Sequence, residues 1–410
     1  MSSYGGWAGK VLHINLNRET ISEYAWTDLD RERYLGGKIM VARILLAHLS
    51  VQELAFSEET CVVITTGPLT GTGAPGSARF DIAFLSPQKD LPAFSNCGGD
   101  FGIQLKKAGY DGLILTGRCR EKRWLEIRRD TVAFHDAKPL WGTGTVRCQQ
   151  MLSELLGTQQ FGRLCIGHAG ENLVKFASAI GDGHAAGRAG IGAVLGYQNL
   201  KAITVSGDGE IPVFHSQAAA AWNRAWHADL QRKAGDDGRT SCRGCPLRCR
   251  KTSPPEKDAI LNDLGMDGIA ADNAAAWAAE QGISVQGLYE DIALRRGIGD
   301  RLAEGVPFRR GKDGKRRGGN DRALAKAFGL APDAQETKTF CRALTEAVSS
   351  AGQCIFTLNA LESQEGEAAE LPAIKMLELV TGMELNLDQF LQFGMRALEL
   401  EQQLNLIFGK

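Results

Sequence analysis

The short stretch 241–249, Ser-Cys-Arg-Gly-Cys-Pro-Leu-Arg-Cys, constrains this chain more than any other part of it. It places Cys242, Cys245 and Cys249 in a Cys-x2-Cys-x3-Cys spacing, with a glycine and a proline between them that let the backbone turn tightly. Thiols this close together can converge on one metal centre, and a four-iron cluster or a structural zinc ion takes four ligands. The loop therefore predicts a metal site whose fourth ligand comes from another part of the chain.

Three interpretations of this loop compete, and a [4Fe–4S] cluster is the favoured one. A zinc site is the second, although zinc loops more often use two separate Cys-x2-Cys pairs or histidines, and no histidine follows His227. The third, a set of reduced structural thiols, would leave three neighbouring cysteines open to oxidation. Only Cys341 and Cys354 lie downstream, so one of them is expected to close the site.

Composition narrows the class of protein. The sequence is 43% apolar and 23% charged, as in ordinary globular proteins, and its net charge of −1 gives no sign of a nucleic-acid-binding or membrane-binding surface. The N-terminus lacks the basic and apolar regions of a signal peptide, and no apolar run is long enough to span a bilayer. Ten cysteines without an export signal indicate a reducing, cytoplasmic environment, in which they act as ligands or buried thiols.

The pattern changes near residue 206 from strands to helices. Alternating and apolar segments predict strands at 10–16, 20–24, 61–66, 78–85, 112–117, 124–129, 131–135 and 202–206, and helices at 29–48, 101–107 and 146–156. Helical periodicity dominates afterwards, at 216–233, 269–281, 284–296, 335–348 and 387–408. The sequence therefore predicts an α+β protein with a β-rich domain at 1–206 and a helical part at 207–410 that carries the cysteine loop.

Glycine-rich stretches in the first half suggest phosphate binding. Residues 67–79 read Gly-Pro-Leu-Thr-Gly-Thr-Gly-Ala-Pro-Gly-Ser-Ala-Arg, residues 95–99 read Ser-Asn-Cys-Gly-Gly, and residues 187–193 read Gly-Arg-Ala-Gly-Ile-Gly-Ala. Exposed amides at glycine turns and helix starts attract anions, and Arg79 could add a charged fork. None of these stretches fits a P-loop or the dinucleotide fingerprint. Together with the cysteine loop, they indicate a large phosphate-bearing cofactor beside an iron–sulfur centre.

The chain resembles the tungsten-containing aldehyde:ferredoxin oxidoreductase family. Further stretches that carry the resemblance are Gly-Lys-Val-Leu at 9–12, Tyr-Leu-Gly-Gly at 34–37, Leu-Lys-Lys-Ala-Gly-Tyr-Asp-Gly at 105–112, Gly-Glu-Asn at 170–172 and Lys-Ala-Ile at 201–203. The cysteine loop is similar to the family's cluster loop. The stretch Asn-Asp-Leu-Gly-Met-Asp at 262–267 resembles the first of its two pterin motifs, and Ser-Ser-Ala-Gly-Gln-Cys at 349–354 lies where the second belongs.

This resemblance implies two pyranopterin molecules around one tungsten or molybdenum ion, with a [4Fe–4S] cluster nearby. The residues implied to lie against the pterin phosphates and a bridging magnesium ion are Arg79, Asn96, Cys97, Gly98, Arg188, Ala189 and Gly190. The resemblance also makes Cys354 the fourth cluster ligand and Asp267 a pterin contact from the helical half. Cys341 lies in an amphipathic helical pattern and is expected to be a buried thiol.

Structural roles compete with these assignments. Arg79 and Arg188 could be ordinary surface arginines. Asn96 could cap the helix that follows it, and Asp267 could cap the helix expected at 269–281.

The chain also departs from the family pattern. Asn262 and Ser349 stand where the family carries aspartates that bind pterin ring nitrogens, and an amide or a hydroxyl binds such nitrogens differently. The helical half is short, and the histidine proposed as the family's proton donor has no counterpart, because no histidine follows His227. A substitute general acid is not evident from the sequence.

Three functions follow. The first is an oxidoreductase that acts on an aldehyde or related oxo group and passes electrons through the cluster to ferredoxin. The second is a non-catalytic electron-transfer or scaffold subunit of a larger redox complex that retains the cluster. The third is a zinc-stabilised binding protein of the same fold. Family members also suggest a homodimer, although no interface stripe is evident.

Overall fold

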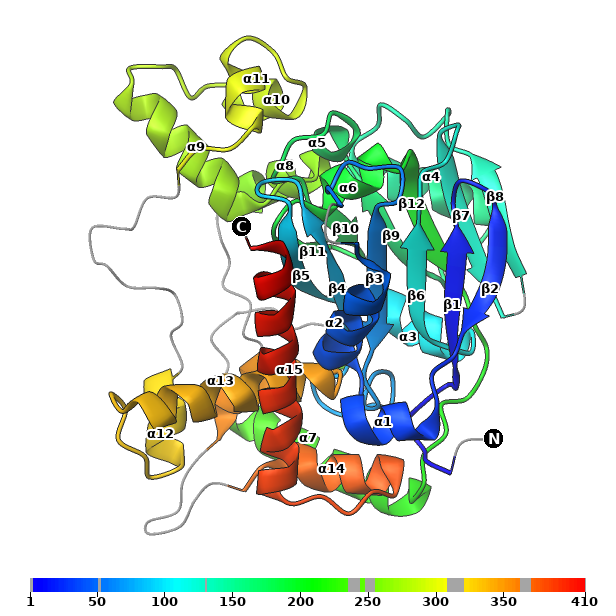
Figure 1. Cartoon of the computed structure of the whole chain (residues 1–410), viewed down its shortest axis with the longest axis vertical. Coiled ribbons are helices and arrows are strands. Elements are labelled where there is room, and N and C mark those ends of the chain that lie inside the picture. Colours follow the sequence, from blue (N-terminus) through cyan, green and yellow to red (C-terminus); the bar gives the residue numbers. More distant parts are fainter. Residues whose placement is uncertain are drawn as a thin grey trace.

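A computed structural model describes residues 3–50, 53–129, 131–234, 244–247, 255–307, 321–361 and 370–409. Figure 1 shows two sheets side by side in the first half of the chain, with the helices of the second half stacked along one edge of them. Both sheets are six-stranded and mixed, and the last strand along the chain is Leu200–Val205. The structure therefore confirms the predicted α+β class, with a sheet-rich first part and a mainly helical second part.

The first sheet has the strand order β2-β1-β6-β3-β4-β5. Its strands are β1 (Lys10–Asn15), β2 (Thr20–Tyr24), β3 (Cys61–Thr66), β4 (Arg79–Ser86), β5 (Leu91–Gly98) and β6 (Tyr110–Thr116). Only β1 and β6 pair in parallel; the other neighbours are antiparallel. The sheet thus ends in the hairpin β4–β5, in which Arg79 pairs with Gly98 and Asp81 with Asn96.

The second sheet has the strand order β11-β10-β9-β12-β7-β8. Its strands are β7 (Arg123–Arg128), β8 (Thr131–Asp136), β9 (Gly162–Ile166), β10 (Ala179–Gly181), β11 (His184–Ala186) and β12 (Leu200–Val205). Its end strand β11 lies beside β5, the end strand of the first sheet. The edges of the two sheets therefore meet at one place.

Side chains that alternate along the strands build the core of the first half. Val62 and Ile64 of β3 face a large cluster shared with the second sheet, whereas Cys61 and Val63 face the opposite side. This is the period of two that a strand imposes. The helices that cover the sheets are α1 (Asp28–Tyr34), α2 (Gly37–His48), α3 (Asp100–Lys107), α4 (Thr145–Leu156), α5 (His168–Glu171) and α6 (Ile191–Tyr197).

The second half forms two groups of helices. The first comprises α8 (Pro255–Leu264), α9 (Gly268–Glu280), α10 (Leu288–Ala293) and α11 (Ile298–Ala303). The second comprises α7 (Ser216–Ala234), α12 (Asp321–Ala327), α13 (Gln335–Ser350), the 3-10 helix η1 (Ile355–Ala360), α14 (Pro372–Thr381) and α15 (Leu387–Phe408). In the second group, α15 contacts β5 and α2, and α13 contacts α2. The helical half thus packs on the β5 side of the sheets (Figure 1).

Several elements differ from the sequence prediction, which did not include strands β5, β9, β10 and β11. The helix expected at 29–48 is broken at Leu35 and Gly36, because Gly36 packs so closely on Thr66 and Gly67 that a Cβ there would collide with them. Residues 91–98 form β5, although their proline and small polar residues are poor strand formers. No helix in the described part of the chain is long and apolar enough to cross a membrane.

Candidate cofactor site

A polar cavity of about 480 Å³ lies where the two sheet edges meet helices α8 and α9. Its size falls within the range usual for small-molecule sites. The residues that line it are Ser95, Asn96, Ala185, Gly187, Arg188, Lys257, Asp258, Leu261, Asn262, Met266, Asp267, Gly268, Ile269 and Asp272. The cavity therefore brings together three of the predicted cofactor residues, Asn96, Arg188 and Asp267, and the first residue of the 262–267 motif.

An ion pair joins the two sides of this cavity. Arg188, after β11, donates from Nη1 to both carboxylate oxygens of Asp267 at 3.2 Å. Asp267 also accepts a hydrogen bond from the Ile269 amide at 2.9 Å, so it caps α9 as the structural alternative proposed. Burial raises the pKa of Asp267, and the Arg188 charge partly opposes that rise. Arg188 is more than half exposed, but its pairing places it in the cavity wall.

Ala189 and Gly190 hold Arg188 in position. Ala189 has a φ of 62°, and its carbonyl accepts a hydrogen bond from the Ser86 hydroxyl at 2.8 Å. Gly190 has a φ of 91°, and a Cβ there would collide with the Lys175 carbonyl and Pro87. This left-handed pair turns the chain from β11 into α6, so the structure shows a geometric role for both residues.

A chain of hydrogen bonds links Arg79 to the end of α13. Arg79 Nε donates to Asn96 Oδ1 at 2.5 Å, and Asn96 Nδ2 donates to Asp81 Oδ1 at 3.0 Å. Ser349 Oγ donates to the same Asp81 oxygen at 3.1 Å. Arg79 is half-buried, so it is no ordinary surface arginine. Asn96 lies within β5, and Gly99 is the N-cap of α3, so the alternative that Asn96 caps a helix is wrong.

Cys97 and Gly98 complete the predicted set. The Cys97 side chain points into the core shared by the two sheets, and its thiol contacts the Gly98 carbonyl at 3.4 Å. A Cβ at Gly98 would lie 2.9 Å from Arg79 Nη1, so this glycine gives the guanidinium its space. The structure thus explains Gly98 by the approach of Arg79.

Asp81 was not predicted from the sequence, and burial raises its pKa from 3.8 to about 6. Hydrogen bonds from Asn96 and Ser349 and the charges of Lys38 and Arg79 oppose this rise only in part. The sequence around Asp81 does not indicate a functional residue, because the residues that contact it come from the distant elements β5 and α13. A carboxylate in a run that reads Arg-Phe-Asp-Ile-Ala could have been singled out only as a buried charge in need of partners.

This raised pKa predicts a stability that depends on pH. Because the folded state binds the Asp81 proton more tightly, its stabilising effect is full below pH 3.8 and is lost as pH rises through about 6. The whole loss is about 3 kcal/mol, of which roughly 1 kcal/mol falls between about pH 5 and 7.5. Urea unfolding should therefore show the Asp81→Asn variant gaining that much stability relative to the unmodified protein over this range. An unchanged difference, or a gain for the unmodified protein, would contradict the assignment.

Most amides of the 67–79 stretch bond to the protein itself. The Gly71 amide donates to the Ser77 carbonyl, and the Leu69 amide donates to the Ala351 carbonyl at 2.9 Å. The Cys354 amide in turn donates to the Gly76 carbonyl at 2.9 Å. This glycine stretch is therefore the surface on which residues 349–354 dock, and it leaves Cys354 half-buried at the start of η1.

The cysteine loop is described only at 244–247. Cys242 and Cys249, two of the predicted cluster ligands, lie outside the described residues, whereas Cys245 and Cys354 lie within them. Leu247 packs against the apolar cluster that also contains Ala74 and Leu358. The described ranges contain no group of three or more His, Cys, Asp or Glu side chains that could hold a metal, so the four-cysteine set remains a prediction.

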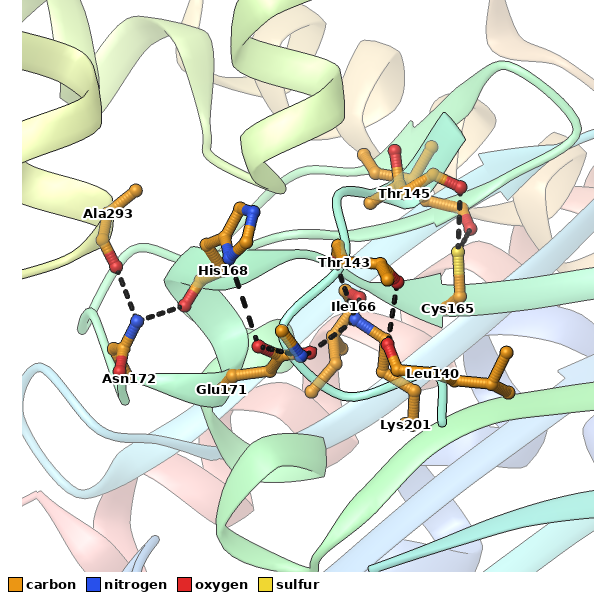
Figure 2. A network of polar contacts seen from close by, with 12 residues as sticks. Leu140, Thr143, Thr145, Cys165, Ile166, His168, Glu171, Asn172, Lys201 and Ala293 are labelled. Atoms are coloured by element: carbon orange, nitrogen blue, oxygen red, sulfur yellow. Dashed lines mark hydrogen bonds and ion pairs between the residues drawn. The ribbon is translucent and has the colours of Figure 1, made fainter. Parts of the chain in front are cut away.

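A buried network of polar contacts surrounds Lys201 (Figure 2). Lys201 is fully buried and donates to the Thr143 carbonyl at 2.8 Å, to the Ile166 carbonyl at 2.7 Å and to Glu171. The loop it holds continues to Thr145, whose hydroxyl donates to the Asn262 carbonyl at 2.8 Å. The stretches 170–172 and 201–203 thus meet, and they fix the segment that carries the 262–267 motif.

The residues around the cavity fit a pterin phosphate. Arg188, Lys257 and the side-chain amide of Asn262 can donate to phosphate oxygens, while the carboxylates can accept from the N–H groups of a pterin ring. The Ser95 hydroxyl, in the cavity wall, is buried and has no hydrogen-bond partner among the described residues. A buried hydroxyl of this kind is satisfied when a polar ligand fills the space beside it.

The sequence profile of a known domain family matches much of the first half. It is described as "Aldehyde ferredoxin oxidoreductase, N-terminal domain", and it matches residues 11–207. Similar curated proteins are the "Tungsten-containing aldehyde ferredoxin oxidoreductase" of Thermococcus kodakarensis, 36% identical over 215 residues, and that of Pyrococcus horikoshii, 38% identical over 211 residues. These matches cover 52% and 51% of this chain but 35% of each relative. The chain thus spans about a third of the length of these curated relatives.

A further curated protein and a solved structure extend the comparison. The "Aliphatic sulfonate oxidoreductase, WOR-like subunit" of Pyrococcus furiosus is 34% identical over 222 residues. A solved structure described as "Active site complex BamBC of Benzoyl Coenzyme A reductase in complex with 1,5 Dienoyl-CoA" has a TM-score of 0.80 and 21% identity. The match covers 99% of this chain and 90% of that one, so the fold similarity extends through the helical half.

Proposed function

We propose that this protein is an oxidoreductase for aldehyde or other oxo groups, because residues 11–207 match the family described as "Aldehyde ferredoxin oxidoreductase, N-terminal domain". Its cofactors would be a tungsten or molybdenum ion held by pyranopterin, with a magnesium ion at the phosphates, and a [4Fe–4S] cluster. The observation that carries the proposal is the cavity in which Asn96, Arg188 and Asp267 meet. Residues from both halves of the chain converge there.

The residues of the cavity have separate parts in this proposal. Arg188 would bind phosphate oxygens, and Asp267 would fix its guanidinium through their ion pair at 3.2 Å. Asn96 would hold Arg79 at the edge of the site through the bond from Arg79 Nε at 2.5 Å. The Asn262 amide would bind the pterin ring from the opposite wall. When bound, the metal–pterin group supplies the redox chemistry of the carbonyl substrate. The chain itself supplies binding, orientation and charge.

Electrons would leave through the cysteine loop to a ferredoxin or a ferredoxin-like subunit. The segment 349–354 supports this route. Its first residue, Ser349, is bonded to Asp81, and its last residue is Cys354. A cluster held by Cys242, Cys245, Cys249 and Cys354 would therefore lie a few residues along the chain from the cofactor network. Single electrons pass between such centres when they are held close together in protein.

Removal of the Arg79 side chain tests the proposed cofactor site. The Arg79→Ala variant is expected to keep its iron but to lose most of its pterin, because it takes away the cation that is bonded to Asn96. The protein would be purified without oxygen, its pterin would be oxidised to the fluorescent form, and the ratio of pterin to iron would be measured. Arg163→Ala is the matched control: this arginine pairs with Asp182 away from the cavity lining, so its pterin content should stay near that of the unmodified protein. A pterin content in Arg79→Ala equal to that of the unmodified protein would count against the proposal.

The residue types that line the cavity favour a second function, that of an electron-transfer or scaffold subunit. Among the described residues of that lining there is no histidine, so a proton donor of the usual kind is missing there. The protein would then act as an electron-transfer or scaffold subunit of a redox complex. Iron without tungsten or molybdenum in the purified protein would support this function over the first.

A further inference from the structure

Two donors from different halves of the chain converge on one buried carboxylate. Asp81 is 2% exposed and lies opposite Asn96 in the β4–β5 hairpin. Its Oδ1 accepts from Asn96 Nδ2 at 3.0 Å and from Ser349 Oγ at 3.1 Å. Asp81 is absent from the cavity lining, whereas Asn96 forms part of it. The carboxylate therefore lies one hydrogen bond behind the cavity wall.

This carboxylate decides which way the Asn96 amide points. A side-chain amide has a donor end and an acceptor end, and an ionised carboxylate can only accept. With the NH2 end held by Asp81, the oxygen end faces Arg79 Nε at 2.5 Å. A bond at Nε fixes the plane of the guanidinium, which keeps four further N–H donors for an anion.

We infer that Asp81 is a positioning residue of the cofactor site, which orients Arg79 through the Asn96 amide. This inference deepens the proposed function and rests on it in so far as Arg79 and Asn96 bind the cofactor. The geometry also explains why position 349 carries a hydroxyl instead of a carboxylate. A second carboxylate there would face Asp81 at about the distance that the Ser349 hydroxyl now spans, and two charges so close repel.

Exchange of the two side chains is the sharpest test. In Asp81→Ser the Asn96 amide loses its charged acceptor, and in Ser349→Asp two carboxylates crowd the same place. The double variant Asp81→Ser/Ser349→Asp again has one carboxylate and one hydroxyl, and Asn96 Nδ2 can reach the new carboxylate because it already lies 3.4 Å from Ser349 Oγ. Each single variant should therefore be impaired, and the double variant should recover.

The readout is the Arg79 Nε–H proton in a heteronuclear NMR spectrum, assigned by its absence from Arg79→Lys. We expect slow solvent exchange of this proton in the unmodified protein and in the double variant, and exchange faster by roughly tenfold in Asp81→Ser. Ser349→Ala keeps the bond between Asp81 and Asn96, so it should leave the exchange rate unchanged. A double variant that exchanges as fast as Asp81→Ser, or an Asp81→Ser variant that exchanges slowly, would overturn the inference.

Pterin content of the same variants separates this inference from the proposed function. If the unmodified protein binds pterin, its amount should follow the NMR result: low in Asp81→Ser and recovered in the double variant. If the unmodified protein holds no pterin while Arg79 behaves as expected, the proposed function fails and the positioning of Arg79 by Asp81 stands. Pterin that stays constant across all variants would overturn the role of Asp81 in the cofactor site.

Discussion

Replacing Cys354 by serine is expected to remove most of the iron from protein purified without oxygen, whereas replacing Cys341 by serine should leave the iron in place. Cys354 is half-buried at the start of η1, with its amide held by the Gly76 carbonyl at 2.9 Å. Cys341 is fully buried in the apolar face of α13, and its thiol contacts the Asp321 carbonyl at 3.6 Å. A cluster ligand must present its thiolate to the metal, which a side chain enclosed in the core cannot do.

The two substitutions are matched, because each exchanges one sulfur for one oxygen near the same helix. Iron would be measured per folded chain, with the charge-transfer absorption of the cluster as a second readout. Loss of iron from the Cys341 variant alone would show that the wrong cysteine was assigned. Cys341 and Cys354 are both free thiols, so neither substitution breaks a disulfide.

Replacing Gly67 by alanine is expected to destabilise the protein by roughly 3 kcal/mol, at the upper end of the cost of overpacking. A Cβ at Gly67 would overlap the Gly352 nitrogen and the Ala351 carbonyl, and both are backbone atoms that no side-chain rotation can move. The contact joins the sheet-rich half to residues 349–354, so the substitution pushes the two halves apart. Urea unfolding and the yield of soluble protein would measure the effect.

Gly268→Ala is the control for this substitution. A Cβ at Gly268 would lie 3.6 Å from Leu261 Cδ1, which is an ordinary contact, and Gly268 begins α9. Alanine there should change the free energy of unfolding by about 1 kcal/mol at most, because alanine is the better helix former. A Gly67→Ala variant as stable as Gly268→Ala would mean that residues 349–354 do not dock on Gly67 as the structure has them.

Much of the fold could be predicted from local patterns. Strands such as β3 and β6 are strongly apolar, and helices such as α13 and α15 show clear periodicity, so both kinds of element were predicted where the structure has them. Strand β5 was missed, because its proline and small polar residues carry little strand propensity and its pairing with β4 decides the structure. The change from sheet to helix near residue 206 was evident from the change in hydrophobic periodicity along the sequence.

The candidate site was predictable in its residue types and less so in its geometry. Arg188 and Asp267 were singled out separately, but their ion pair joins residues from two distant segments. The 67–79 stretch was expected to bind phosphate, and the structure gives most of its amides protein partners. Within the 105–112 motif, Lys106 is buried and lies 3.6 Å from Asp111, so part of this motif serves packing. Asp81 could not be foreseen, because its partners become neighbours only in the folded chain.

The metal and pterin content of the full chain, purified without oxygen, tests the central claim most directly. The account predicts about four iron atoms per chain, as a [4Fe–4S] cluster requires, together with pterin and either tungsten or molybdenum. One zinc ion per chain with neither iron nor pterin, or a chain that binds no metal at all, would contradict it.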